Sequence, residues 1–407
     1  MNLEKLYDDN GMFLYNTDDY KTINGKLYFL IDNNLKDFLT CQLLSLLFKM
    51  SNKIYKNPSN KQRELYSMYL GFETKTKESK TFLEISFSFI DRDIIQDNYY
   101  LEVYKFLKNI IFNILFDEQN LKDAKRKLIA DRRHVYSIIK NYINKLYHEQ
   151  TFSNSKIAYI YISDINKIIA EIDSINLEDI KNMYNKLILG NRFYRGLIVG
   201  NMDVQEFESF RKFIPFKSEM ENLDFTDEIP IIKDDIEIPD NKINESFIYI
   251  TYTTKKDSYA IINILNSILN SKKLCLQIIR EKYKIAYHAE AYFKYSNNSI
   301  IFFGQISKEN KEKFIAAVNE IIDTIQDEQK LKNLILDGKE KLKENYFLIS
   351  ERKNILIDNL ANYILNSNGD YSYEDLIKNL DFYDEKRIVE YTKSFAKQST
   401  FMYRGDK

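Results

Sequence analysis

The chain has 407 residues, of which 44% are hydrophobic and 29% are charged, a composition that supports a buried core and excludes global disorder. Lysine and arginine number 59 against 60 aspartate and glutamate residues, and the formal net charge of -1 argues against a nucleic-acid-binding protein. The first residues lack the pattern of a signal peptide and no apolar run is long enough for a membrane span, so we expect a cytoplasmic protein.

The first half of the chain predicts a hairpin followed by helices and strands. Asn10-Gly11 between two apolar runs is typical of a tight hairpin turn. The second expected helix has Ser59 as its N-cap and Gly71 just past its end. The elements expected in this half are strands at 26–31, 83–89 and 192–200 and helices at 35–51, 59–70, 97–116, 118–147 and 155–187.

The strand at 83–89 has the clearest pattern, because apolar and polar residues alternate strictly along it. One face of this strand should therefore be buried. The residues of that face are Leu83, Ile85, Phe87 and Phe89.

The second half of the chain repeats this order of elements. Tyr184 and Tyr391 end two similar helices, and Phe193 and Thr400 lie in the strands that follow, at the same offset of 207 residues (391 − 184 and 400 − 193). The elements expected here are strands at 246–252, 285–294 and 299–306, helices at 257–270, 272–281 and 309–366, and a last strand after residue 399.

Three of the four prolines fall in one acidic and weakly periodic stretch, which we interpret as a linker. The predicted organisation is an N-terminal domain at 1–210, a linker at 211–243 and a C-terminal domain at 244–407. Runs of strands followed by runs of helices indicate an α+β fold of two tandem homologous αβ domains. Each domain should have a mostly antiparallel sheet covered by helices on one face.

Cysteine and histidine give little support for redox or metal chemistry. Cys41 and Cys275 lie in apolar helical surroundings and are interpreted as buried free thiols. His134 and His148 are 14 residues apart (148 − 134) on one predicted helix, about 21 Å along its axis, too far to share a metal, and His288 stands alone. No His-Glu-x-x-His, His-x-x-Glu-His or phosphate-binding glycine loop occurs.

One segment of the second half matches a known family motif. Residues 276–287 contain Arg280-Glu281-Lys282 followed by Ala286-Tyr287, similar to the second-domain motif Leu-Phe-x-x-x-Arg-Glu-Lys-x-Gly-Leu-Ala-Tyr of the insulinase or pitrilysin family of inverted-zincin peptidases. The Asn10-Gly11 hairpin, residues 172–201 and Gly304 resemble the same family. The resemblance covers nearly the full length and implies the paired αβ domains of that family.

The chain departs from the family where its peptidases bind zinc. Aligning Phe48-Lys49 with the Phe-Lys after the family's His-x-x-Glu-His motif puts Cys41, Leu44 and Ser45 in the degenerate zinc-motif positions. The region of the later glutamate ligand resembles 124–131, which keeps Asp131 as its one carboxylate. The resemblance therefore implies a non-catalytic subunit with no metal in this chain and zinc in a partner subunit.

The remaining role implied by the resemblance is substrate handling. In the family, the residues that match Arg280 and Tyr287 project toward a partner domain's zinc site and help to hold the substrate. We thus expect a catalytically inactive subunit of a heterodimeric zinc peptidase. Its partner would be a zinc-bearing homologue of similar size, and its substrate a peptide or precursor peptide.

Two alternatives stay open. The first is a homodimeric peptide-binding or scaffold protein without hydrolysis. The second is an enzyme with a replaced site around Cys41.

Overall fold

A computed structural model of the chain describes residues 6–77, 81–95, 99–190, 192–218, 235–255, 259–271, 274–294, 298–365, 373–378 and 380–406. The chain forms two compact units, each with its own sheet. Unit 1 comprises Met1–Ile138, Asp164–Leu223 and Lys353–Ser367; unit 2 comprises Ile139–Ser163, Asp224–Arg352 and Asn368–Lys407.

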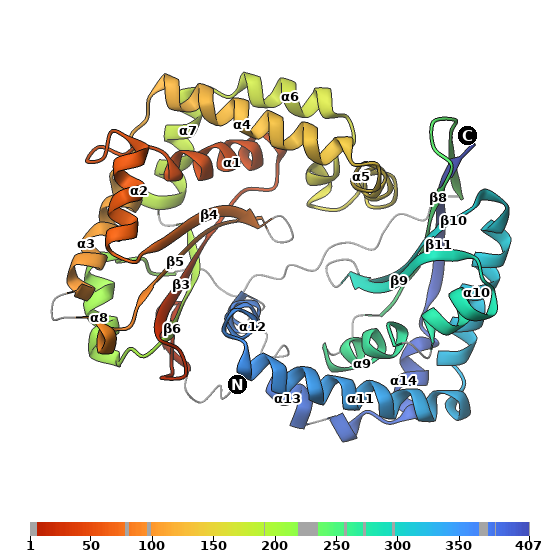
Figure 1. Ribbon diagram of the computed structural model, residues 1–407. Helices are drawn as coiled ribbons and strands as arrows, with labels where there is room; N and C mark the ends of the chain where they lie inside the picture. The colour runs from red at the N-terminus through yellow and green to blue at the C-terminus, as the bar shows by residue number, and fades with distance from the viewer. Residues whose placement is uncertain are drawn as a thin grey trace. The chain divides into compact units, whose positions relative to one another are not determined.

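The sheet of unit 1 has the strand order β1-β2-β6-β3-β5-β4 (Figure 1). All neighbours are antiparallel except β2 and β6. The predicted turn joins β1 and β2, where Asn10 and Gly11 both have positive φ, 53° and 79°, as a tight hairpin requires. The strands are β1 (Leu6–Asp9), β2 (Met12–Asn16), β3 (Thr22–Leu30), β4 (Gly71–Lys77), β5 (Phe82–Ile90) and β6 (Phe193–Gly200).

The predicted alternation of β5 is confirmed, since its four apolar side chains are buried and their face packs against α3 and α8. One helix, α12, comes from the second half of the chain and contacts β6. Figure 1 shows α12 on the other side of this sheet from α3 and α8. The helices of unit 1 are α1 (Leu35–Lys49), α2 (Pro58–Ser67), α3 (Tyr99–Phe112), α4 (Glu118–Ser137), α6 (Ile165–Ser174), α7 (Leu177–Tyr184), α8 (Val204–Phe213) and α12 (Lys353–Leu365).

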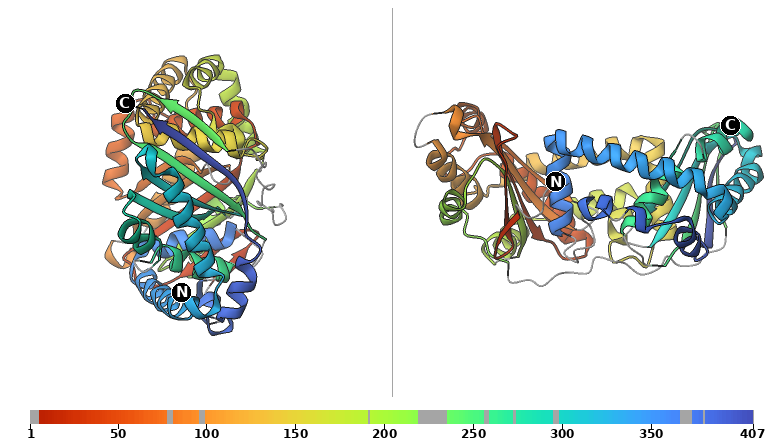
Figure 2. Two further views of the ribbon diagram at one scale, coloured as in Figure 1. Left: turned by 90° about the vertical axis from the view of Figure 1, so that its right-hand side faces the viewer. Right: turned by 90° about the horizontal axis from the view of Figure 1, so that it is seen from below.

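The sheet of unit 2 has the order β7-β11-β8-β10-β9, again with one parallel pair, β7 and β11. Helix α10 contacts β10, and α9 contacts β9 (Figure 2). The strands are β7 (Ile236–Asp240), β8 (Ser246–Thr253), β9 (Ala286–Lys294), β10 (Ser299–Ile306) and β11 (Ala396–Gly405). The helices are α5 (Ile139–Thr151), α9 (Tyr259–Leu269), the π-helix η6 (Leu276–Lys282), α10 (Lys311–Ile325), α11 (Glu328–Glu351), α13 (Tyr373–Lys378) and α14 (Glu385–Thr392).

The predicted α+β fold with two tandem, mostly antiparallel sheets is confirmed. Strands β2-β6-β3-β5-β4 and β7-β11-β8-β10-β9 have the same order and the same directions, so the two sheets repeat one topology. Gly304 in β10 permits the close approach of α10, because a Cβ there would lie 2.4 Å from the Phe314 ring. No helix within the described ranges has the length and apolar character needed to cross a membrane.

Each compact unit includes one segment from the other half of the sequence. The segment Ile139–Ser163 of the first half belongs to unit 2, and Lys353–Ser367 of the second half belongs to unit 1. Helix α5 packs on the second sheet, and Tyr147 in it stacks on Tyr249 with ring centroids 4.1 Å apart. The boundaries 1–210 and 244–407 stay a prediction about the repeated halves of the chain.

Several predicted helices are shorter than expected. The helix predicted at 118–147 is wrong as one element, because Ile138 has extended ψ (109°) and separates α4 from α5. The helix predicted at 155–187 is interrupted because Asn176 starts α7 with a capping box to Asp179. The helix predicted at 309–366 comprises α10, α11 and α12.

The predicted N-cap of the second helix is also wrong. Asn57 caps α2, accepting a hydrogen bond from the Ser59 backbone at 2.8 Å, and Pro58 occupies the first turn, where no amide donor is needed. Helix α2 ends at Ser67, Tyr69 takes a left-handed φ of 48°, and Gly71 begins β4 rather than closing the helix.

The predicted linker at 211–243 contains ordered elements at both ends. Helix α8 continues to Phe213, and β7 includes Pro239, which an edge strand tolerates because one of its sides needs no amide donors. Residues 219–234 of the linker, with Pro230, lie outside the described residues.

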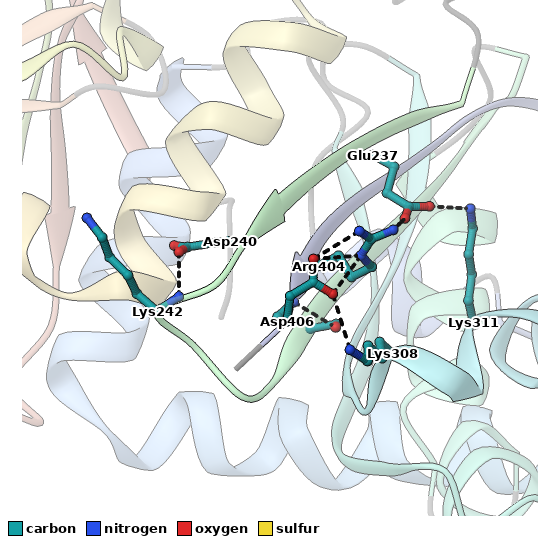
Figure 3. Close-up of polar contacts among 9 residues, drawn as sticks. Glu237, Asp240, Lys242, Lys308, Lys311, Arg404 and Asp406 are labelled. Carbon is teal, nitrogen blue, oxygen red and sulfur yellow. Dashed lines mark hydrogen bonds and ion pairs between the residues drawn. The ribbon is translucent and has the colours of Figure 1, made fainter.

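Charged side chains join β7 to β11 and to neighbouring segments (Figure 3). The Arg404 guanidinium binds both carboxylate oxygens of Asp406, at 3.0 and 2.9 Å, and also donates to Glu237. Lys311 donates to the same Glu237 at 2.9 Å, and Lys308 lies 3.3 Å from Asp406. These pairs connect the parallel strands to α10 and the turn before it.

Candidate functional site

The three degenerate zinc-motif positions lie on α1, which Asn34 caps by accepting from the Asp37 amide at 2.8 Å. Cys41 and Leu44 are 0% exposed and Ser45 is 5% exposed, so all three belong to the packed interior of unit 1. The Ser45 carbonyl accepts a hydrogen bond from the Thr74 hydroxyl of β4 at 2.6 Å. This face of α1 is therefore filled by protein atoms.

The donors at these positions do not fit zinc. Burial raises the pKa of the Cys41 thiol far above its ordinary value, so the thiolate that binds metal is strongly disfavoured. Leu44 has no donor atom, and a serine hydroxyl does not replace an imidazole. Within the described residues, no group of three histidine, cysteine or acidic side chains is placed to hold a metal ion.

Helix α4, which carries the region of the predicted later ligand, packs next to α1. Ala124 is buried, and Asp131 is exposed. Beside Cys41, the Gln42 amide accepts from Arg132 of α4 at 2.6 Å and donates to Thr76 of β4 at 3.1 Å. An amide bridge thus joins α1, α4 and β4.

A polar cavity of about 720 Å³ lies on the opposite face of the sheet of unit 1, beside α12. Glu84 of β5 is 2% exposed and lines this cavity, with the ammonium groups of Lys75 and Lys26 at 3.4 and 3.9 Å from its carboxylate. Lys26 also pairs with Asp358 of α12 at 2.5 Å. The lysines compensate the cost of burying the Glu84 carboxylate.

Strand β4 borders the cavity and forms the edge of the sheet, pairing only with β5 among the described strands. Its outer edge carries backbone donors and acceptors that a sheet normally uses for pairing. An extended peptide can bind such an edge as an additional strand.

Arg280 lies in unit 2, near the end of the π-helix η6, and its side chain is exposed. Lys282, not Arg280, makes the ion pair with Glu320 of α10, at 2.6 Å, and Tyr283 donates to the same carboxylate at 3.1 Å. No described residue forms a hydrogen bond or an ion pair with Arg280. Its neighbours fix the end of η6 and leave the guanidinium facing solvent.

Tyr287 lies near the start of β9, where the pairing with β10 shifts register between Gln305 and Ile306. Its side chain lies outside what the structure describes. Arg280 and Tyr287 belong to unit 2, and the zinc-motif positions belong to unit 1.

The three histidines lie in separate places. His134 is exposed on α4 of unit 1, and His148 is buried in α5 of unit 2, so the single helix on which their separation was argued does not exist. Burial and the nearby Lys294 ammonium lower the pKa of His148 to about 3. The His288 ring lies 3.6 Å from the Glu290 carboxylate.

The sequence reasoning missed Gln42, Arg132 and Glu84. Gln42 and Arg132 are 90 residues apart, and nothing in either segment indicates that they pair. Glu84 lies on the polar face of the alternating strand at 83–89, where the pattern predicts exposure, so no local signal indicated that its carboxylate is buried.

Comparison with known proteins supports the resemblance. Residues 174–337 match the family model described as "Peptidase M16 inactive domain". No protein of curated description matches the sequence.

Several solved structures share the fold. A conserved protein from Enterococcus faecalis V583 is 19% identical with a TM-score of 0.84, and the match covers 98% of this chain and 97% of that one. A peptidase M16 inactive domain from Pseudomonas fluorescens is 12% identical, with a TM-score of 0.76 and coverage of 97% and 95%. The periplasmic protease PqqL from Escherichia coli is 16% identical with a TM-score of 0.77, and this chain, 99% covered, matches 48% of it.

At these identities the solved structures show a common fold, and the family model adds a sequence match in the region that joins the two halves. Together they confirm the resemblance inferred from the sequence: residues 174–337 match the peptidase M16 inactive domain, and the chain shares its fold over nearly its whole length with a solved domain of that description.

Proposed function

We propose that this chain is a non-catalytic subunit that binds peptides and pairs with a zinc-bearing insulinase-like homologue to form a peptidase. The observation that carries the proposal is the burial of Cys41, Leu44 and Ser45 in a chain that keeps the fold of its relatives over nearly its whole length. Selection for catalysis would have kept zinc ligands at these positions, whereas selection for assembly and substrate binding requires only the fold.

The substrate-binding part of the proposal uses two features. The outer edge of β4 offers backbone pairing to an extended peptide. The exposed Arg280 offers a guanidinium whose donors can bind peptide carbonyls or a developing oxyanion at the partner's zinc site, with Tyr287 supplying a hydroxyl. Zinc and the general base would come from the partner subunit.

The cytoplasmic location belongs to this proposal and is independent of the mechanism. The fold occurs in the periplasmic protease PqqL, so it is compatible with either compartment.

The test is peptidase activity of the reconstituted complex with substitutions in this chain. We expect Arg280→Ala and Tyr287→Phe to lower turnover by about 10²-fold while the complex still assembles, because each removes one donor at the reacting carbonyl. Lys341→Ala, which changes an exposed lysine on α11, is the matched control and should leave turnover unchanged. Unchanged turnover in both variants would contradict the role assigned to the pair.

A further inference from the structure

A second cavity, of about 410 Å³, lies within unit 2 between α5 and the strands β8, β10 and β9. Its described lining residues belong to unit 2, whereas the zinc-motif positions belong to unit 1, and Arg280 is not among those lining residues. Its size falls in the range of small-ligand pockets, which is about 300 to 1,000 Å³.

Aromatic rings from three neighbouring strands line one side of this cavity. Tyr249 of β8 and Phe303 of β10 are directly paired residues of neighbouring strands, and their ring centroids are 4.8 Å apart. The two residues are 2% and 1% exposed. Tyr292 of β9 continues the lining, and Tyr147 of α5 stacks on Tyr249 with ring centroids 4.1 Å apart. The rings form a rigid aromatic wall.

Two lysines place positive charge beside this wall. The Lys140 ammonium lies 5.0 Å from the centroid of the Phe303 ring. The Lys294 ammonium is held between two rings, 3.9 Å from the Phe152 centroid and 4.6 Å from that of Tyr161. Such cation–π contacts hold an ammonium group against the face of a ring.

The other ionisable groups of the lining leave a positive balance. Glu290 is the one carboxylate among the described lining residues. His148 is neutral at physiological pH because burial lowers its pKa to about 3, and its Nδ1 lies 2.7 Å from the Asn144 carbonyl. Lys140 and Lys294 therefore exceed Glu290 by one charge.

We propose that this cavity binds the C-terminal residue of a peptide when that residue is aromatic, with its ring against Tyr249 and Phe303 and its carboxylate toward Lys140. An aromatic C-terminal residue carries a flat apolar ring, which fits the aromatic wall, and a carboxylate, which fits the lysine ammonium. A cavity of this volume holds about one or two residues. The proposal deepens the peptide binding proposed above and names the class of peptide.

The test uses the isolated chain and three fluorescently labelled pentapeptides, each with four glycines before the last residue. One ends in phenylalanine with a free carboxylate, one in phenylalanine amide and one in alanine with a free carboxylate. Anisotropy titrations should give the first peptide an affinity about tenfold higher than that of either other peptide, because a charge-assisted contact or a ring contact is lost in each.

Lys140→Met separates this site from any other peptide site. Lys140 is exposed, so its replacement leaves the fold intact, and the preference for free carboxylate over amide should disappear in this variant. Lys242→Met, at an exposed lysine outside the cavity, should keep the preference. Equal affinity of acid and amide for the unmodified chain, or a preference that survives Lys140→Met, would overturn the proposal.

These outcomes are distinct from failure of the proposed function. The absence of a zinc-bearing partner would remove the peptidase complex and leave the peptide preference intact. Tight binding of all three peptides alike would remove the pocket and leave binding at the β4 edge possible.

Discussion

Mild acid should destabilise unit 2 through His148, whose ring is 6% exposed and stacks on Tyr161 at 4.6 Å. The ordinary pKa of 6.5 falls to about 3 in the folded chain, first because burial disfavours the charged ring and second because Lys294 lies nearby. The unfolded chain therefore binds a proton at a pH where the folded chain does not.

The sign of the effect follows from this difference. The stability contributed by neutral His148 is fully present above pH 6.5 and is lost as the pH falls from 6.5 toward 3. Each pH unit in that window corresponds to about 1.4 kcal/mol, so unfolding at pH 5 should require about 2 kcal/mol less than at pH 7.

The assay is urea unfolding at pH 7 and pH 5, followed by circular dichroism. The unmodified chain and His288→Gln, at an exposed histidine of the same unit, should lose the about 2 kcal/mol, and His148→Gln should lose much less. Equal losses in the unmodified chain and His148→Gln would show that His148 does not cause the acid sensitivity.

Three further predictions concern buried groups. Tyr147→Phe should lower the free energy of unfolding by about 1 kcal/mol, because the Tyr147 hydroxyl forms a hydrogen bond with the buried Thr251 hydroxyl at 2.7 Å. Urea titration checks this against the half-buried control Tyr142→Phe, and equal effects of the two substitutions would contradict it. Cys41 and Cys275 should not react with Ellman's reagent in the folded chain and should both react in guanidinium chloride. Burial raises the pKa of both thiols, that of Cys275 to about 12. Rapid reaction of either thiol in the folded chain would contradict this. Restoring the zinc motif by Cys41→His, Leu44→Glu and Ser45→His should destabilise unit 1 by more than about 3 kcal/mol, because Leu44 is fully buried. Thermal unfolding and metal analysis check this. A stable variant that binds one zinc would contradict it and would show that the site is intact.

Local sequence patterns predicted the elements that depend on local chemistry. The strict alternation at 83–89 identified the buried face of β5, Asn10-Gly11 identified the hairpin, and β10 has the predicted bounds of 299–306. The repeat offset predicted that both halves share one topology, because equivalent strands need equivalent partners.

Features set by tertiary contacts could not be predicted in this way. The apolar pattern continues through Ile138 without glycine or proline, so nothing local marks the break that separates α4 from α5. Pro239 suggested a linker, yet β7 tolerates it as an edge strand. The Gln42–Arg132 bridge and the aromatic cavity unite side chains from distant segments, which composition and periodicity do not reveal.

Pairing with a zinc-bearing subunit can be tested by purifying the tagged chain from its native host and determining the mass, the companion chains and the zinc content of the complex. We expect a companion of similar size that carries His-x-x-Glu-His, with one zinc per pair. A zinc-free homodimer or monomer would contradict it and would favour a peptide-binding protein without hydrolysis.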